Sequence, residues 1–271
     1  MDIAKGGDRG VDAAGKTIFI TGAASGMGAA TARRFAAERW FVGCFDIDRS
    51  GLAALAEELG EERAMFLPLD VADPIAFAGA VAAFGAITDG RMDVLHNNAG
   101  VISHGRFQDM DWETVERIIA VNLLGPMIGV RSARLLLERT PNSLCFFTGS
   151  ASSIFGAADL AAYSASKHGL RGFAEAMALE LHPHGIRVGH AVTGITDTAM
   201  LPPEHRSALP TEGMFRLMQP SVMADTVWAA YHDEVETLHR YVPPELAQYE
   251  AIAATQPSAV RDDGRARLSV R

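Results

Sequence analysis

A tyrosine and a lysine stand four residues apart at Tyr163 and Lys167. On a helix this spacing places both side chains on one face, so both can point into the same cleft. A phenol has an ordinary pKa of about 10 and is a weak base at neutral pH. An ammonium group within about 4–6 Å lowers that pKa. The pair therefore predicts a group that takes a proton from an alcohol or returns it to a ketone.

Lysine is scarce in this chain, which makes the pair informative. The 24 basic residues include lysine only at Lys5, Lys16 and Lys167, so the one lysine beyond residue 16 is the one that follows a tyrosine. Ser150 stands 13 residues before Tyr163, at the end of a predicted strand. Its hydroxyl can bind a substrate oxygen as charge develops there. Ser152 and Ser153 remain alternatives for that role.

A glycine-rich turn, TGAASGMG over residues 21–28, follows the first predicted strand and leads into a helix. Glycines at such a place let the backbone approach a pyrophosphate, whose charge then lies at the helix N-terminus. The residues expected to bind a dinucleotide here are Gly22, Ser25, Gly26, Met27 and Gly28. An ordinary glycine-rich turn remains the structural alternative.

Two acidic residues end the next strands. Asp46 lies 24 residues after Gly22, where a carboxylate accepts the adenosine ribose hydroxyls and repels a 2′-phosphate. Asp48 adds to this repulsion and Arg49 opposes it, so the sequence favours NAD(H). Asp70 fits a carboxylate that holds the adenine amino group, and both acids could instead cap turns. Ile47 and Val71, beside these acids, complete the expected adenosine end.

Short apolar runs alternate with helical patterns along the chain, which indicates βαβ units. The pattern predicts an α/β fold with a doubly wound parallel sheet of about seven strands and helices on both faces. Expected strands are 17–20, 41–45, 64–69, 93–96, 143–147, 187–191 and 240–242, and expected helices are 27–38, 52–59 with Ser50 as its cap, 74–84, Trp112–Arg139 and 162–181. We expect one domain over 15–249, a flexible segment over 1–14 and a polar tail over 250–271.

Composition limits the possible partners. The 24 basic and 33 acidic residues leave a net charge of −9, which argues against nucleic acid and anionic membranes. Cys44 and Cys145 lie in apolar runs, so we expect buried thiols in a reducing compartment. The N-terminus has glycine and charge where a signal peptide is apolar. The apolar run 76–87 is too short to cross a bilayer, and these features together predict a cytoplasmic protein.

In order and spacing, these motifs resemble the short-chain dehydrogenase/reductase family over residues 15–200. The resemblance rests on TGAASGMG, the NNAG of residues 97–100, Asn122, Ser150 and the Tyr163–Lys167 pair. It implies a single Rossmann-type domain and an NAD(H)-dependent transfer of hydride to or from a secondary alcohol or ketone. Tyr163 would act as general acid and base, and Lys167 would also bind the nicotinamide ribose.

The resemblance assigns roles to further residues. Asn122 would hold a water at a local helix distortion as part of a proton relay, unless it is an outward-facing polar residue. Asn98, Ala99 and Gly100 would contact the cofactor, while Asn97 could brace the sheet. Gly194, Thr196 and Thr198 would form the loop around the nicotinamide carboxamide. Thr193 departs from the proline usual in the family, which suggests a less rigid turn.

The substrate side is less specific in the sequence. Residues 200–220 are apolar and interrupted by prolines, which predicts either a lid over a small, fairly apolar alcohol or ketone or a segment that packs against the body or a neighbouring subunit. The long helices resemble the family's dimer-forming pair, so we expect a homodimer or homotetramer. His104 could face the substrate or lie in a surface loop, and His182 and His184 end a helix rather than bind a metal. The alternatives are a reductase of acyl-carrier-bound 3-ketoacyl chains and a non-catalytic NAD(H)-binding regulator or scaffold.

Overall fold

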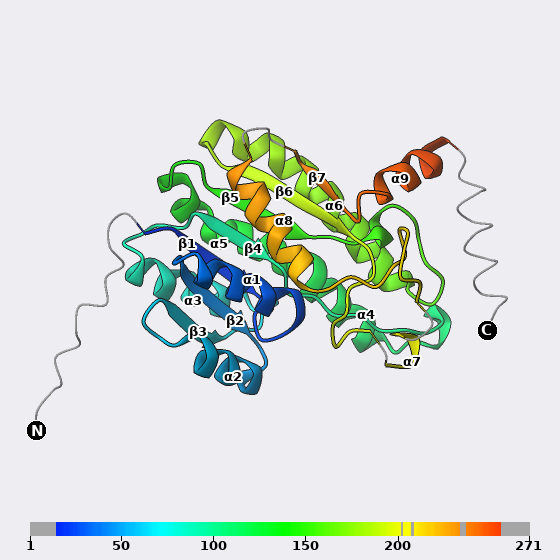
Figure 1. Cartoon of the computed structure of the whole chain (residues 1–271), viewed down its shortest axis with the longest axis horizontal. Helices are drawn as coiled ribbons and strands as arrows, with labels where there is room; N and C mark the ends of the chain where they lie inside the picture. The colour runs from blue at the N-terminus through cyan, green and yellow to red at the C-terminus, as the bar shows by residue number, and fades with distance from the viewer. Residues whose placement is uncertain (1–14, 202, 207–208, 234–236, 256–271) are drawn as a thin grey trace, which may run out of the picture.

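The computed structural model describes residues 15–201, 203–206, 209–233 and 237–255. Seven parallel strands form one sheet in the order β3-β2-β1-β4-β5-β6-β7 (Figure 1). The strands are β1 (Thr17–Thr21), β2 (Phe41–Asp46), β3 (Ala64–Pro68), β4 (Val94–Asn97), β5 (Leu144–Thr148), β6 (Arg187–Thr193) and β7 (His239–Val242). The predicted doubly wound sheet is confirmed, and the expected N-terminal segment 1–14 lies outside the described residues.

Helices cover both faces of the sheet (Figure 1). On one face lie α1 (Gly26–Ala37), α2 (Arg49–Leu59) and α8 (Ser221–His232), and on the other α3 (Pro74–Ile87), α5 (Gly125–Arg139) and α6 (Ala161–Leu181). The others are α4 (Trp112–Ile119), the short α7 (Pro203–Arg206) and α9 (Leu246–Thr255) beside β7. The strands read as continuous apolar runs because each face of the sheet is buried.

The chain leaves β1 in two directions, through β2 to β3 on one side and through β4 to β7 on the other. At such a switch point the loops after neighbouring strands diverge and leave a crevice at the carboxyl ends. The glycine-rich turn follows β1 and the NNAG segment ends β4, so both reach this crevice. Phe19 and Phe45, stacked at 3.8 Å between ring centroids, lie on adjacent strands in the core beneath it.

Two expectations about elements are wrong in detail, and one is confirmed with a distortion. Asp48, not Ser50, caps α2, because its carboxylate accepts the N–H groups of Ser50 and Gly51. The expected helix Trp112–Arg139 is present and contains a π-helical turn at Ala120–Leu124. Residues 250–255 of the expected tail continue α9, and 256–271 lie outside the described residues.

The run Trp112–Arg139 is long and apolar enough to cross a membrane by length and composition. In the structure it packs instead against the sheet and neighbouring helices, with Val115, Ile118 and Val130 buried. Cys44 and Cys145 are buried as expected, and burial raises the pKa of the Cys44 thiol to about 12.

A buried carboxylate ties the amino ends of β1 and β4 to α8. Asp93 is fully buried and accepts hydrogen bonds from Lys16 at 3.1 Å, Arg91 at 2.6 Å and the hydroxyl of Tyr231 at 3.0 Å. Burial by itself would raise the pKa of the Asp93 carboxyl. The hydrogen bonds from Arg91 and Lys16 outweigh burial and hold that pKa below its ordinary value.

We predict that Asp93→Asn lowers the free energy of unfolding at pH 7 by about 2–3 kcal/mol, because it removes the buried counter-charge of the partly exposed Lys16 and Arg91. The folded-state pKa lies below the unfolded value of about 3.9, so the contribution is complete above that value and disappears as the pH falls through the folded-state pKa. Urea unfolding at pH 7 and pH 3 measures it. Glu58→Gln, which removes an exposed ion pair with Arg33, is the control and costs about 1 kcal/mol or less. If Asp93→Asn lowered the free energy of unfolding equally at both pH values, the ionised Asp93 carboxylate would not be the source of this stability.

Candidate active site

Two adjoining cavities lie at the carboxyl ends of the strands. The first cavity, of about 180 Å³, extends from the glycine-rich turn towards Asp70. The second cavity, of about 790 Å³, lies between Ser150, Tyr163 and the segment that follows β6. The residues that line both are Met27, Asn98, Gly100, Thr198 and Met200. The two cavities therefore meet along the turn and the end of β4.

The structure brings most of the predicted cofactor residues to these cavities. Those that line the first are Gly22, Ser25, Gly26, Met27, Asp46, Ile47, Asp70, Val71, Asn98, Ala99, Gly100 and Thr198. Those that line the second include Tyr163, Lys167, Gly194 and Thr196. Gly28 and Asn122 line neither cavity, so each of these residues acts, if at all, through its neighbours.

The glycine-rich turn requires glycine at specific points. Gly22 has a φ of +67°, and a Cβ built on it would lie 2.8 Å from the Cα of Ala99. A Cβ on Gly28 would lie 1.9 Å from the carbonyl oxygen of Gly22, so the turn packs directly against the backbone of Gly28. The turn passes directly into α1, whose first N–H groups point at the first cavity. This backbone cradle fits a pyrophosphate.

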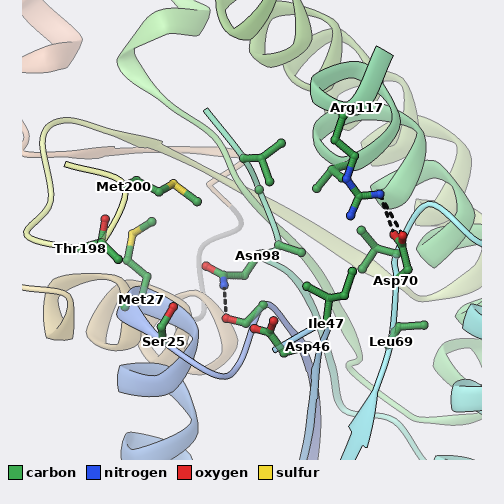
Figure 2. A pocket seen from close by; sticks show the side chains of 18 residues that line it. Ser25, Met27, Asp46, Ile47, Leu69, Asp70, Asn98, Arg117, Thr198 and Met200 are labelled. Carbon is green, nitrogen blue, oxygen red and sulfur yellow. Dashed lines mark hydrogen bonds and ion pairs between the residues drawn. The ribbon is translucent and has the colours of Figure 1, made fainter. Parts of the chain in front are cut away.

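Asp46 holds the turn as well as lining the first cavity. Its two carboxylate oxygens accept the N–H groups of Ala24 and Asp48, each at 2.9 Å. Each carboxylate oxygen has a second lone pair, so ribose hydroxyls can still be accepted. Asp48 is occupied as the cap of α2, and Arg49 is exposed and outside the lining of the cavity. Asp46 is thus the acidic group that faces the cavity from this side (Figure 2).

Asp70 is paired with a residue that the sequence analysis missed. Arg117 of α4 donates to both oxygens of Asp70, at 2.9 and 3.2 Å, and both side chains line the first cavity (Figure 2). The N–H of Ala72 also donates to Asp70, so the expected turn cap is present too. Burial would raise the pKa of Asp70, but these hydrogen bonds hold it below its ordinary value. Arg117 is the basic residue of an otherwise apolar and acidic helix, yet no local pattern links it to Asp70.

The NNAG segment is braced by its asparagines. The amide of Asn98 donates to the carbonyls of Thr21 and Gly22 at 3.0 and 3.1 Å, and the hydroxyl of Thr148 donates to its oxygen. Asn97 is buried between β5 and α5, as the bracing alternative predicted, and its amide contacts the sulfur of Cys145 at 3.7 Å. Asn98 therefore fixes the turn after β1 to the ends of β4 and β5.

Ser150, Tyr163 and Lys167 converge on the second cavity. Ser150 follows β5 and accepts the N–H of Ser152 at 3.1 Å, while Tyr163 and Lys167 lie one turn apart on α6. The ammonium of Lys167 lies 5.7 Å from the ring centroid of Tyr163 and donates to the carbonyl of Thr148 at 2.9 Å. Burial lowers the pKa of Lys167 to about 8, so the charged form predominates at neutral pH.

The net lowering of the Tyr163 pKa that the sequence predicts is wrong for this structure, because burial outweighs the effects that favour the phenolate. Burial raises the pKa of the Tyr163 phenol, and a hydrogen bond with Ser150 opposes that rise only in part. The lysine is directed to Thr148 rather than to the phenol oxygen. The protonated phenol is therefore the favoured state, and it is ready to act as an acid.

Asn122 lies in the π-helical turn, so the predicted distortion of the helix is present. Its side chain is fully buried rather than outward-facing, and it holds both backbone groups of Val101, at 2.8 and 2.9 Å. A Cβ built on Gly100 would lie 3.4 Å from the Asn122 oxygen and 3.8 Å from the Lys167 nitrogen. Asn122 thus positions the segment next to Lys167 without lining the cavity.

The loop after β6 is fixed differently from the expectation. Thr193 extends the strand opposite Val242, and its hydroxyl donates to the carbonyl of Gly149 at 3.0 Å. This bond ties the loop to the residue before Ser150, so the absence of proline does not leave the turn loose. Beyond it, Thr196 forms a β-bridge with Met218.

The predicted lid contributes to the second cavity through Met200, Leu201, Leu209 and Phe215. His104 is exposed and also lines this cavity, so both alternatives for it hold in part. His182 and His184 form a short turn after α6, and His184 contacts Glu138 at 3.0 Å. The lid and His104 thus complete the walls of the second cavity.

Comparisons with known proteins agree with this geometry. A sequence model described as short chain dehydrogenase matches residues 16–208. Momilactone A synthase of Oryza sativa is 40% identical over 177 residues, which cover 64% of each chain. A 2,5-dichloro-2,5-cyclohexadiene-1,4-diol dehydrogenase of Sphingobium indicum is 36% identical over 70% of this chain and 78% of its own. Cyclopentanol dehydrogenase of a Comamonas species is 31% identical over 83% of this chain and 92% of its own.

Solved structures show the same fold. BdcA in complex with NADPH superposes with a TM-score of 0.75 at 27% identity, covering 84% of this chain and 93% of that one. A 3-ketoacyl-(acyl-carrier-protein) reductase from Brucella melitensis, complexed with NADH, has a TM-score of 0.76 at 26% identity. The match covers 84% of this chain and 96% of that one. The two structures hold different dinucleotides, so they leave the choice between the two to the residues of this chain.

We predict that Gly28→Ala weakens NADH binding by about tenfold or more, because the added methyl collides with the Gly22 carbonyl and displaces the turn by about an ångström. Titration of NADH fluorescence measures the dissociation constant. Gly79→Ala is the matched control, since a Cβ on Gly79 in α3 meets nothing within 4 Å. Equal affinities for the two variants would refute the role given to Gly28.

Proposed function

The chain belongs to the short-chain dehydrogenase family, whose enzymes act on hydroxyl and keto groups, and on this premise we propose that it transfers hydride between NAD(H) and a secondary alcohol or ketone. The observation that carries the proposal is the convergence of Ser150, Tyr163 and Lys167 on one largely apolar cavity that adjoins the cavity at the glycine-rich turn. A bound nicotinamide dinucleotide supplies the hydride donor or acceptor. The protein's own groups bind, orient and move the proton.

Tyr163 is the proposed proton donor and acceptor. In ketone reduction its phenol, which is protonated at neutral pH, gives a proton to the substrate oxygen. In alcohol oxidation the phenolate must form, and the positive charge of Lys167, 5.7 Å from the ring, stabilises it. The hydroxyl of Ser150 holds the substrate oxygen while its charge changes.

Lys167 and Asn122 have supporting roles in the proposal. Lys167 binds the nicotinamide ribose with the hydrogens that the Thr148 carbonyl leaves free. The backbone of the π-helical turn at Asn122 holds a water that connects Lys167 to solvent. The short separation between Asn122, Gly100 and Lys167 supports this connection.

The preference for NAD(H) over NADP(H) rests on Asp46. Its carboxylate faces the first cavity, where a 2′-phosphate would meet a like charge. Arg49, which could attract such a phosphate, lies outside the lining. Asp70 and Arg117 lie across the same cavity, and we propose that Asp70 receives the adenine amino group while Arg117 keeps its carboxylate oriented.

The proposed substrates are uncharged and carry an aliphatic ring. The apolar side chains that line the second cavity include Ile102, Phe155, Leu160, Leu209 and Phe215. Apart from Lys167, whose hydrogens the proposal assigns to Thr148 and the ribose, the described lining offers no lysine or arginine to a carboxylate or phosphate. The relatives named for a cyclohexadienediol and for cyclopentanol support a ring alcohol. A homodimer or homotetramer and a cytoplasmic location stay predictions.

We predict that Tyr163→Phe lowers kcat for cyclopentanol and cyclohexanol oxidation by about 100-fold or more, because it removes the hydroxyl that takes the proton beside Ser150 and Lys167. NADH absorbance measures turnover, and NADH fluorescence should give an unchanged dissociation constant. Tyr231→Phe, in the distant Asp93 cluster, is the control with unchanged kcat. A fully active Tyr163→Phe enzyme would contradict the assignment of Tyr163 as the proton donor and acceptor.

The same assays separate the alternatives. A wild-type protein that binds NADH but turns over no alcohol or ketone would support the regulator or scaffold. Strong preference for a 3-ketoacyl thioester over ring ketones would support the acyl reductase, which the similarity to the Brucella enzyme makes worth including.

We predict that Asp46→Asn lowers the ratio of kcat/KM with NAD to that with NADP by about tenfold, since it removes the charge but keeps an oxygen that can accept from the turn. Initial rates with each cofactor and one saturating alcohol give the ratio. Asp73→Asn, which alters the exposed cap of α3 outside the lining of the first cavity, is the control. The interpretation of Asp46 is wrong if the unaltered enzyme already prefers NADP.

A further inference from the structure

Helix α9 packs against two aromatic side chains that line the second cavity. Tyr249 of α9 is buried, and its ring lies edge-on to Phe155 at 5.1 Å and to Phe215 at 5.9 Å between centroids. Both phenylalanines line the second cavity, whereas Tyr249 lies outside its lining. Edge-to-face contact is a favoured geometry for aromatic rings. Tyr249 therefore determines how far the aromatic wall can move away from the catalytic groups.

The position of Tyr249 is fixed relative to the catalytic helix. Its neighbour Glu250 accepts from Arg171 of α6 at 2.6 Å and from the hydroxyl of Tyr241 on β7. Burial would raise the pKa of Glu250, but these hydrogen bonds hold it below its ordinary value, so the ion pair is formed at neutral pH. Arg171 lies one turn after Lys167 on α6. The helix that carries the reacting groups and the one that supports the wall are thus joined directly.

The chain directly after Phe215 is held at two points. Arg216 forms an ion pair with Glu245, next to the start of α9, at 2.9 Å. Met218 exchanges backbone hydrogen bonds with Ile195 and Asp197 of the loop after β6, at 2.9 and 2.8 Å. Phe215 is therefore followed first by an anchor to α9 and then by an anchor to the loop after β6.

We propose that Tyr249 is a positioning residue that sets the upper size of the ring substrate by supporting Phe155 and Phe215. This inference rests on the proposed function. Protein interiors are closely packed, so removing a buried ring leaves space into which neighbouring side chains relax. Retreat of the two phenylalanines enlarges the second cavity at this aromatic wall. Bulkier rings then fit better and small rings lose contacts, while the proton-transfer groups stay unchanged.

The experiment compares Tyr249→Ala with Tyr249→Phe, which keeps the supporting ring. The measured quantity is the ratio of kcat/KM for 2-decalol to that for cyclopentanol. We expect Tyr249→Ala to raise this ratio by about tenfold, comparable with the effect of one methylene in an apolar pocket. The change should come from KM, with kcat for cyclopentanol and the NADH dissociation constant unchanged. Tyr249→Phe should keep the original ratio.

An unchanged ratio in Tyr249→Ala, or an equal loss for all alcohols, would overturn the proposal. Tyr249→Leu, which retains apolar volume in the same place, replaces the alanine variant if that one does not fold. Calorimetric binding of 2-decalone and cyclopentanone keeps the test independent of turnover. If the wild type oxidises no alcohol, the proposed function fails, and the ratio of the two dissociation constants still decides whether Tyr249 limits the size of the ligand.

Discussion

The buried ammonium group of Lys167 is the constraint around which the site is arranged. Lys167 is only 3% exposed. Burying an ion in a low-dielectric interior costs free energy unless the ion is paired or hydrogen-bonded. The Thr148 carbonyl at the end of β5 receives one hydrogen, and the pKa of about 8 leaves the charge intact at neutral pH. His190 beneath α6 adds no second charge, since burial and the nearby charges of Lys167, Arg171 and His239 hold its pKa at about 3.

The reacting groups and the walls of the cavity are built in different ways. Ser150, Tyr163 and Lys167 lie at a strand end and on a long helix, elements that the sheet holds rigidly. The walls come from the segment after β6 and from α9, which depend on ion pairs and aromatic contacts between late parts of the chain. Such a division lets the substrate-contacting residues change without disturbing the chemistry.

Much of the fold and of the reacting set could be predicted from sequence because the signals are local. The strands are continuous apolar runs between polar turns, and each was predicted to within about two residues, the ordinary precision for strongly patterned elements. The Tyr163–Lys167 spacing places both on one helical face whatever the surroundings. The position of Asp46 at the end of a strand predicted that its carboxylate faces the first cavity. The cap of α2 was assigned to the wrong residue because Asp48 and Ser50 are both good caps and differ only in geometry.

By itself, then, the sequence determined the α/β class, the parallel strands, the glycine-rich turn and the tyrosine–lysine pair. Only the tertiary structure decided the pairing of Arg117 with Asp70, 47 residues away, and the support that Tyr249 gives to Phe155. It also reversed the expected direction of the Tyr163 pKa. The reason is physical: spacing along one helix is fixed by backbone geometry, whereas burial and long-range contacts depend on how every crossover packs against the sheet.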